Sequence, residues 1–133
     1  MVVIYGFSMD PESLNIYYDC YNFGNCVSDG QSHQKLQHCI SNVTAQDLEE
    51  AYQYVNGGFF KYKSSDEVDA VKEYCSYKGQ QKRDAFDETL NGVLSYKMKV
   101  CASSQEQDQC TRFKKALNCF FPILEEFHEQ GKC

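Results

Sequence analysis

The hydrophobic residues of this chain recur mainly three or four positions apart. That spacing places apolar side chains on one face of a helix, as in helices that pack against a core. Strict alternation of apolar and polar residues is scarce, so we expect little or no sheet. The pattern predicts an all-α fold, a single disulfide-stapled bundle of about six or seven short helices in one domain of residues 1–133.

Capping and turn residues place the first two helices. Asp10 followed by Pro11 is a helix start, because aspartate accepts from the first free N–H groups and proline suits the first helical position. We expect this helix to run to Tyr21 or Asn22 and to be ended by Gly24. Asp29-Gly30 predicts a turn, after which Ser32 caps a short second helix. The buried residues expected in these helices are Leu14, Tyr17, Tyr18, Tyr21, Leu36, Cys39 and Ile40.

A variant of the capping box opens the third helix. Thr44 stands at the cap, and Asp47 lies three residues later, where glutamate is commoner. We expect Gly57-Gly58 to end this helix and Phe59-Phe60-Lys61-Tyr62 to form an exposed aromatic loop. The expected buried stripe is Leu48, Ala51, Tyr52 and Val55.

The fourth and fifth helices follow a second capping signal. Ser64 and Glu67 form a capping box, and we expect Gly79 to close the fourth helix. The fifth helix is predicted over about 81–101. Gly92 inside it predicts a bend or a close helix contact, since glycine is unfavourable in a helix. The expected buried residues are Val68, Val71, Tyr74, Cys75, Phe86, Leu90, Val93, Leu94, Met98 and Cys101.

The last helical segment begins with a box of Ser103 and Glu106. Pro122 predicts either a kink or the start of a further helix. We expect Gly131 to terminate the segment and Cys133 to fix the tail. The expected apolar stripe is Cys110, Phe113, Ala116, Leu117, Phe120, Ile123, Leu124 and Phe127.

Cys101, Cys110 and Cys119 recur every nine residues. Nine residues carry a helix about two and a half turns, to its opposite face and about 13 Å along its axis. Disulfides need Cα atoms about 4.4–6.8 Å apart, so Cys110 and Cys119 cannot bond if both lie on one helix. Each must then reach a different neighbour, and we take their helix as the central element.

Eight cysteines predict four disulfides. A zinc site or a redox centre would show Cys-x-x-Cys pairs, and the sequence has none. Disulfides indicate an oxidising compartment, and therefore secretion. The sequence leaves open which cysteines pair among Cys20, Cys26, Cys39, Cys75, Cys101, Cys110, Cys119 and Cys133.

Three further features bear on location. Asn42-Val43-Thr44 is a glycosylation candidate at Asn42. Residues 1–7 lack a basic region and are too short for a signal sequence, so we expect a mature chain without its signal peptide. No run is long enough to span a bilayer, and a net charge of −6 argues against nucleic acid and anionic membranes as partners.

Candidate catalytic groups are sparse. The histidines are His33, His38 and His128, and neither a Gly-x-Ser-x-Gly nor a His-Glu-x-x-His motif is present. His33 and His38 would lie about 140° apart on a helix, a poor metal pair. We expect Glu49-Glu50 and Glu125-Glu126 to lie on solvated helix faces. The sequence therefore predicts no enzyme, no metal and no cofactor.

Ten tyrosines and nine phenylalanines without tryptophan are a less usual feature. The rings could simply fill a small core in place of aliphatic side chains. Alternatively, they line a cavity between helices, since tyrosine suits the rim of a small-molecule pocket and a protein interface. Under this second interpretation the ligand-binding residues are Tyr17, Tyr21, Tyr52, Phe86, Tyr96 and Phe113.

The eight residues between Cys110 and Cys119 resemble the spacing of the last two cysteines in insect odorant-binding proteins. The chain departs from that family at Cys20 and Cys26, which have five residues between them where the family has three, and in having eight cysteines. It is also similar to cysteine-rich helical proteins of arthropod haemolymph, venom and nematode secretions. Either resemblance implies an extracellular binding protein and assigns no functional residue.

Two functions follow as hypotheses. The first is a secreted, non-enzymatic protein that binds a small apolar molecule between aromatic-lined helices. The second is an extracellular protein-interaction module, such as a toxin, effector or matrix component, which would contact another protein through the loop of residues 59–62.

Overall fold

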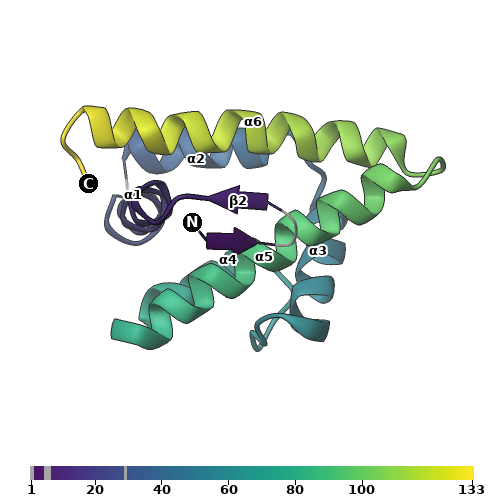
Figure 1. Ribbon diagram of the computed structural model, residues 1–133, viewed down its shortest axis with the longest axis horizontal. Coiled ribbons are helices and arrows are strands. Elements are labelled where there is room, and N and C mark those ends of the chain that lie inside the picture. The colour runs from purple at the N-terminus through teal and green to yellow at the C-terminus, as the bar shows by residue number, and fades with distance from the viewer. Residues whose placement is uncertain (1, 5–6, 29) are drawn as a thin grey trace. The chain divides into compact units, whose positions relative to one another are not determined.

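The structure, a computed structural model, describes residues 2–4, 7–28 and 30–133. Helices dominate the described residues, which confirms the all-α class with little sheet (Figure 1). The elements are β1 (Val2–Ile4), β2 (Phe7–Met9), α1 (Pro11–Asn22), the π-helical η1 (Phe23–Val27), α2 (Gln31–Ile40), α3 (Ala45–Gly58), α4 (Glu67–Ser76), α5 (Gly79–Ala102) and α6 (Gln107–Glu129).

The chain divides into two compact units. The first combines Met1–Asn42 with Lys114–Cys133, and the second is Val43–Phe113. The first unit includes the antiparallel pair β1–β2, in which Val2 faces Met9. The single domain expected for residues 1–133 stays a prediction.

The first unit has its core between α1, α2 and the later part of α6. Leu36, Leu124 and Phe127 are almost fully buried there, together with Cys20. α2 runs alongside α6 (Figure 1), and Lys35 forms an ion pair with Glu126 at 3.0 Å. The partly buried residues around this core are Ile16, Tyr17, Tyr21, Phe23, Phe120, Phe121, Ile123 and Cys133.

Two expected signals in the first unit are wrong. The first helix, α1, ends at Asn22 as expected, but Gly24 does not stop the helical path, because α1 continues directly into η1. A Cβ on Gly24 would lie 2.3 Å from Leu36 Cδ1 and 3.3 Å from Phe127 Cε2, so the glycine serves close packing. Ser32 does not cap α2; the cap is Gly30, and buried Ser32 accepts a hydrogen bond from Lys132. Asp29 of the expected turn lies outside the described residues.

The second unit is built from α3, α4, α5 and the start of α6. α3 packs against α5, and α4 contacts both. Its buried hydrophobic residues include Ala51, Tyr52, Val55, Tyr62, Ala70, Tyr74, Ala85, Phe86, Leu94, Tyr96, Val100, Cys110 and Phe113.

The helix caps predicted at Asp10 and at Thr44 with Asp47 are confirmed, and in each the donor and acceptor lie three residues apart. Asp10 accepts from the Ser13 amide at 2.9 Å. Thr44 and Asp47 make both bonds of the capping box, at 3.0 and 2.9 Å. α3 ends at Gly58, as expected.

The box expected at Ser64 and Glu67 is wrong. α4 begins at Glu67 itself, and its cap is Asp66, which accepts from the Asp69 amide. α4 ends at Ser76, three residues before Gly79. Gly79 has a φ of 58° and begins α5.

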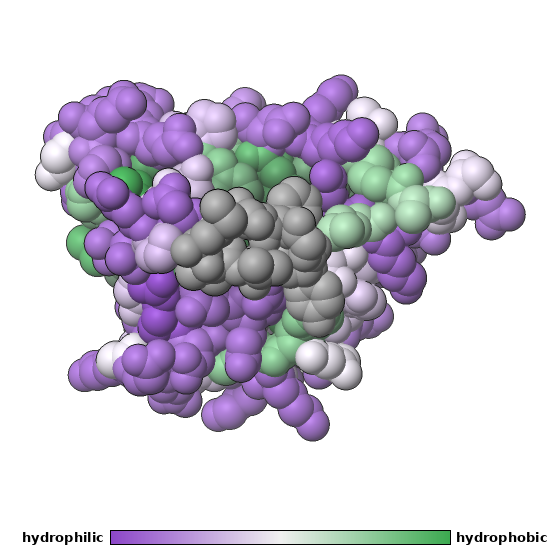
Figure 2. All heavy atoms as spheres, in the orientation of Figure 1, coloured by the Kyte–Doolittle hydropathy of each residue, from purple (hydrophilic) through white to green (hydrophobic). Residues whose placement is uncertain are grey.

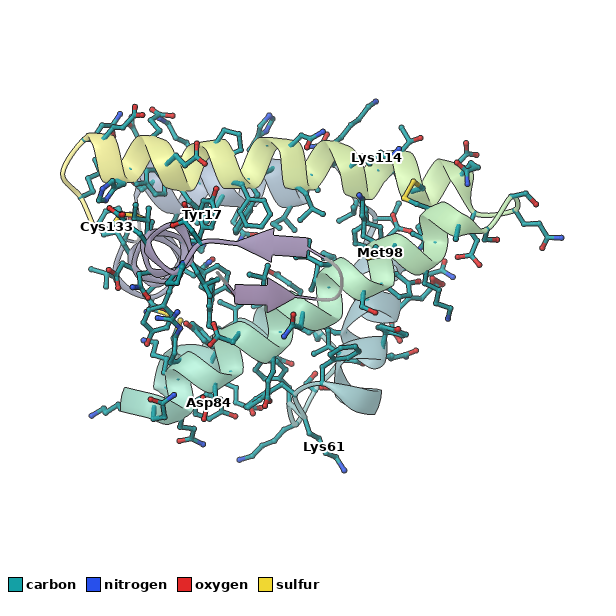
Figure 3. All side chains as sticks on the ribbon, viewed as in Figure 1. Tyr17, Lys61, Asp84, Met98, Lys114 and Cys133 are labelled. Atoms are coloured by element: carbon teal, nitrogen blue, oxygen red, sulfur yellow. A yellow bond between two sulfur atoms is a disulfide. The ribbon has the colours of Figure 1, made fainter. Side chains whose placement is uncertain are left out.

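Two residues expected on buried faces are exposed. Val68 is 54% exposed and Met98, which Figure 3 labels, is 45% exposed, because other residues provide the buried faces of α4 and α5. On α4 these are Ala70 and Tyr74. Purple, hydrophilic residues cover most of the face drawn in Figure 2.

Gly92 makes the close helix contact that the sequence predicts. A Cβ at this position would lie 2.7 Å from Val55 Cγ2 on α3 and 3.1 Å from Phe59 Cγ. Glycine here lets α5 approach α3 and the chain that follows it.

All eight cysteines are disulfide-bonded. Cys110 and Cys119 both lie on α6 and do not pair with each other, as expected. Cys110 bonds Cys101 of α5, with Cα atoms 4.8 Å apart. Cys119 bonds Cys39 of α2, with Cα atoms 5.4 Å apart. The remaining cysteines are Cys26, Cys75 and the pair Cys20–Cys133.

The end of α6 agrees with the prediction that Gly131 terminates this segment. Pro122 lies inside α6, so no further helix begins there. Gly131 has a φ of 74°, and the Lys132 amide donates to the Phe127 carbonyl at 3.0 Å, which closes the helix as a glycine-terminated end. In the part of the chain that the structure describes, no helix combines the length and the apolar character that a membrane crossing requires.

Candidate functional site

The structure distributes the six predicted ligand-binding residues over both units. Tyr17 and Tyr21 lie on α1 in the first unit. The other four belong to the second unit and are buried: Tyr52 on α3, Phe86 and Tyr96 on α5, and Phe113 on α6.

Tyr96 lies in a row of aromatic rings in the second unit. Its ring centroid is 5.3 Å from that of Tyr54 and 5.6 Å from that of Phe113, and the Tyr54 centroid is 5.5 Å from that of Phe59. We call Tyr54, Phe59, Tyr96 and Phe113 the Tyr96 cluster. Such tilted and edge-to-face pairs stabilise beyond the area that they bury.

The local sequence explains how the four rings meet. Phe59 comes directly after α3, where its amide donates to the Val55 carbonyl at 2.9 Å. Gly92 leaves room for the Phe59 ring against α5. Tyr96 follows Gly92 by four residues and therefore lies on the same face of α5.

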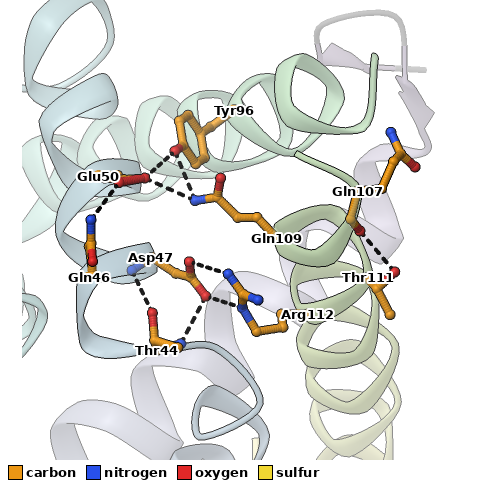
Figure 4. Close-up of polar contacts among 9 residues, drawn as sticks. All are labelled: Thr44, Gln46, Asp47, Glu50, Tyr96, Gln107, Gln109, Thr111 and Arg112. Carbon is orange, nitrogen blue, oxygen red and sulfur yellow. Dashed lines mark hydrogen bonds and ion pairs between the residues drawn. The ribbon is translucent and has the colours of Figure 1, made fainter. Parts of the chain in front are cut away.

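Polar groups converge on the Tyr96 hydroxyl (Figure 4). The hydroxyl donates to Glu50 Oε2 at 3.1 Å. The Gln109 amide donates to the same carboxylate oxygen at 3.1 Å and to the Tyr96 hydroxyl at 3.0 Å. Burial is the main cause that raises the pKa of Tyr96 to about 12, and the neighbouring Glu50 carboxylate raises it further.

The edge of the cluster carries a cation and a hydroxyl pair. Lys99 Nζ lies 5.4 Å from the Tyr54 ring centroid and 5.9 Å from that of Tyr96, within cation–π range. The hydroxyls of Tyr54 and Ser95 are 3.0 Å apart and share a hydrogen bond.

A second polar contact fixes α3 to α6 next to this network (Figure 4). Arg112 donates two bonds to the buried Asp47 carboxylate, at 2.6 and 2.9 Å. Asp47 also accepts from the Thr44 amide, so one carboxylate serves the helix cap and the ion pair. The bond from Arg112 is the main cause that lowers the pKa of Asp47.

Another ring row surrounds Tyr52. Its centroid lies 6.0 Å from that of Tyr62, which lies 4.8 Å from that of Phe60, and Phe60 contacts Tyr77. The Tyr62 hydroxyl shares a hydrogen bond with Thr89 at 2.8 Å, and burial raises the pKa of Tyr62 to about 12.

The expected exposed aromatic loop is therefore wrong in part. Tyr62 is 5% exposed, and Phe59 and Phe60 are half-buried, because their rings contact residues of the same unit. Lys61 is the exposed member of the four and points outward (Figure 3).

Tyr17 and Tyr21 contact phenylalanines within the first unit. The Tyr17 centroid lies 4.9 Å from that of Phe121, and the Tyr21 centroid 6.1 Å from that of Phe120. The Tyr17 hydroxyl donates to Glu125 at 2.6 Å. Burial, with Glu125 adding to it, raises the pKa of Tyr17 to about 12.

The histidines and the metal prediction can be placed as well. His33 Nδ1 lies 2.9 Å from the Gly24 carbonyl and His128 Nδ1 lies 3.1 Å from the Cys133 carbonyl, so each ring donates to the backbone. Within residues 2–4, 7–28 and 30–133 no group of three or more His, Cys, Asp or Glu side chains could hold a metal ion.

Sequence reasoning missed Glu50 and Gln109. Glu50 was expected on a solvated face, but it is half-buried and bonds Tyr96. One signal existed, since Glu50 precedes Tyr54 by four residues and so shares its helix face. No comparable spacing within one helix pointed to the contact between Gln109 and Tyr96, which are 13 residues apart.

The Tyr96 cluster combines apolar walls with a few convergent polar groups. Sites for small molecules have that composition, in which the apolar surface provides binding and the polar groups fix orientation. No family model matches the chain, and comparison with curated protein sequences and with solved structures finds no match.

Proposed function

We propose that the protein is a secreted, non-enzymatic binding protein that carries a small apolar molecule at the Tyr96 cluster. The observation that supports this most is the row of four contacting rings from α3, α5, α6 and the chain after α3, in which the buried Tyr96 carries a hydrogen-bonded hydroxyl. That hydroxyl is bonded by Glu50 and Gln109, which offers a ligand with one polar group a partner inside an apolar wall.

Secretion is supported by the cysteines. All eight are disulfide-bonded, and such bonds persist in oxidising compartments such as the extracellular space. A chain with 42% hydrophobic residues and a mean hydropathy of −0.58 also benefits from covalent cross-links.

A ligand would enter the cluster by separating rings that now contact each other. Phe59 is the member best placed to move, because it is half-buried and follows the end of α3. The molecule would therefore be small and flat or flexible enough to lie against tyrosine and phenylalanine faces.

Displacement of a fluorescent apolar probe tests the proposal. N-phenyl-1-naphthylamine should bind the oxidised protein at one site and be displaced by long-chain alcohols or fatty acids. Phe113→Leu, which removes a ring from the cluster, should weaken probe binding about tenfold, the loss expected for one aromatic contact. Phe121→Leu is the matched control, since Phe121 contacts Tyr17 in the first unit.

The outcomes separate the candidate sites. Equal weakening by both variants, or none by either, would overturn the assignment to the Tyr96 cluster. Weakening by Phe121→Leu alone would transfer the site to Tyr17 and Tyr21. No probe binding to the oxidised wild type would remove the ligand-carrier proposal.

The alternative of a protein-interaction module has less support. Its expected contact, the loop of residues 59–62, presents one exposed side chain, Lys61, while Tyr62 is buried. The large hydrophobic residues that are exposed among the described ones are Val27, Val68 and Met98, and none of them belongs to that loop.

A further inference from the structure

Asn42-Val43-Thr44 is the single Asn-x-Ser/Thr triplet in the 133 residues. In the folded protein, hydrogen bonds engage Asn42 and Thr44, and Val43 is buried. It connects the end of α2 to the cap of α3. Asn42 is half-buried, and its side-chain amide donates to the Cys39 carbonyl at 3.0 Å. The backbone amide of Asn42 donates to the same carbonyl at 3.2 Å. The side chain is therefore held against the end of α2.

The carbonyl that holds Asn42 belongs to a fixed residue. Cys39 is fully buried and is bonded to Cys119 of α6. Releasing the Asn42 side chain from this turn would break its hydrogen bond to that carbonyl, which cannot follow it.

The other two residues of the triplet are also engaged. Val43 is 7% exposed. Thr44 Oγ1 accepts from the Asp47 amide at 3.0 Å, and the Thr44 amide donates to Asp47 Oδ2 at 2.9 Å. Thr44 cannot present its hydroxyl in a different geometry without opening the cap of α3.

We infer that Asn42 is a glycan acceptor that is open to transfer only before this turn has folded. In the transfer, Asn42 Nδ2 forms a bond to C1 of an oligosaccharide carried on a lipid diphosphate. The bond between C1 and the diphosphate oxygen breaks, the lipid diphosphate leaves, and Nδ2 loses one proton. An enzyme that performs this step must reach both the Asn42 amide and the Thr44 hydroxyl, which the folded turn holds in hydrogen bonds.

The occurrence of this modification in cells rests on the proposed secretion, but its dependence on folding does not. A transfer assay in vitro therefore separates the two. It compares the oxidised protein with the same chain reduced and alkylated at its eight cysteines, each incubated with oligosaccharyl transferase and lipid-linked donor.

Peptide mass analysis at Asn42, before and after treatment with peptide N-glycosidase, measures the product. We expect the alkylated chain to be modified, and the oxidised chain to be modified at least about tenfold more slowly, because its acceptor is available only through local opening. Equal rates would overturn the inference, and so would the absence of product in the alkylated chain. Asn42→Gln sets the background in both states.

A pair of variants tests the role of the helix cap directly. Asp47→Ala keeps the triplet and the backbone amide from which Thr44 Oγ1 accepts, but it removes the carboxylate that accepts from the Thr44 amide. The cap of α3 then opens more readily, so the oxidised variant should accept the glycan several-fold faster than the oxidised wild type. Glu49→Ala changes an exposed residue on the same helix and should accept at the wild-type rate. Equal rates for the two oxidised variants would contradict the role of the cap.

Discussion

Asp47 is the residue whose replacement tests the packing of the second unit most sharply. Its carboxylate accepts from the Thr44 amide and from Arg112, and it is 4% exposed. Asp47→Ala leaves the Thr44 N–H without its acceptor, and capping interactions of this kind contribute about 0.5–2 kcal/mol. The Arg112 side chain is 36% exposed, so water rehydrates its guanidinium in the variant. Loss of the ion pair therefore adds less to the destabilisation than loss of the cap. The better helix propensity of alanine offsets about 0.5 kcal/mol.

We therefore expect Asp47→Ala to lower the free energy of unfolding by about 1.5 kcal/mol at pH 7. Urea denaturation of the oxidised protein, followed by circular dichroism, measures the change. Glu49→Ala on the same helix is the control, and its effect should stay within about 0.5 kcal/mol because Glu49 is exposed. Equal effects of the two substitutions would refute the double role of Asp47.

The same carboxylate predicts a pH dependence. The bond from Arg112 lowers the pKa of Asp47 in the folded state below its ordinary value of 3.8. The stability that Asp47 contributes is therefore complete above about pH 3.8 and is lost as the pH falls through the lower, folded-state pKa. The difference between wild type and Asp47→Ala should shrink below that pH, and a difference that grows on acidification would contradict the assignment.

Three further predictions concern the aromatic and glycine positions. Tyr96→Phe removes the hydroxyl between Glu50 and Gln109 and should lower the free energy of unfolding by about 1 kcal/mol in urea denaturation, without loss of helix content. Gly92→Ala should destabilise by about 1–3 kcal/mol through contact with Val55 and Phe59, whereas Gly57→Ala, with no atom within 4 Å of its added Cβ, should not; a stabilised Gly92→Ala would contradict the close helix contact. The pKa values of Tyr17, Tyr62 and Tyr96 are raised to about 12 in the folded state. The stability linked to these shifts is complete below the unfolded pKa of 10.0 and is lost as the pH rises through 12. In a rapid alkaline titration, the tyrosinate absorbance of these residues should therefore appear at a higher pH than that of an unfolded chain.

The sequence predicted those features that depend on neighbours within one helical turn. Asp10 and the pair Thr44 and Asp47 cap helices as expected, because donor and acceptor lie three residues apart. The nine-residue spacing also excluded a bond between Cys110 and Cys119, because helix geometry alone decides that.

Features set by distant packing were not predictable in this way. Gly24 has the composition of a helix stop, yet Leu36 and Phe127 pack against it and the helical path continues. Met98 fits an apolar stripe but is exposed, since the neighbours of α5 decide which face is buried.

The candidate site was predictable only in part for the same reason. Tyr96 and Phe113 were named from their positions on apolar stripes, and their rings do meet. Glu50 and Gln109 reach Tyr96 from positions 46 and 13 residues away in the chain, so no local pattern announces the network.

Native mass spectrometry of the oxidised protein, purified from secreting cells without denaturation, tests the central claim most directly. The account predicts a species heavier by one small molecule than the same disulfide-bonded chain measured after denaturation, which keeps any glycan at Asn42, and loss of that molecule in Phe113→Leu but not in Phe121→Leu. The account would be contradicted by a wild-type protein whose native mass equals that of the denatured chain and that fails to bind the apolar probe.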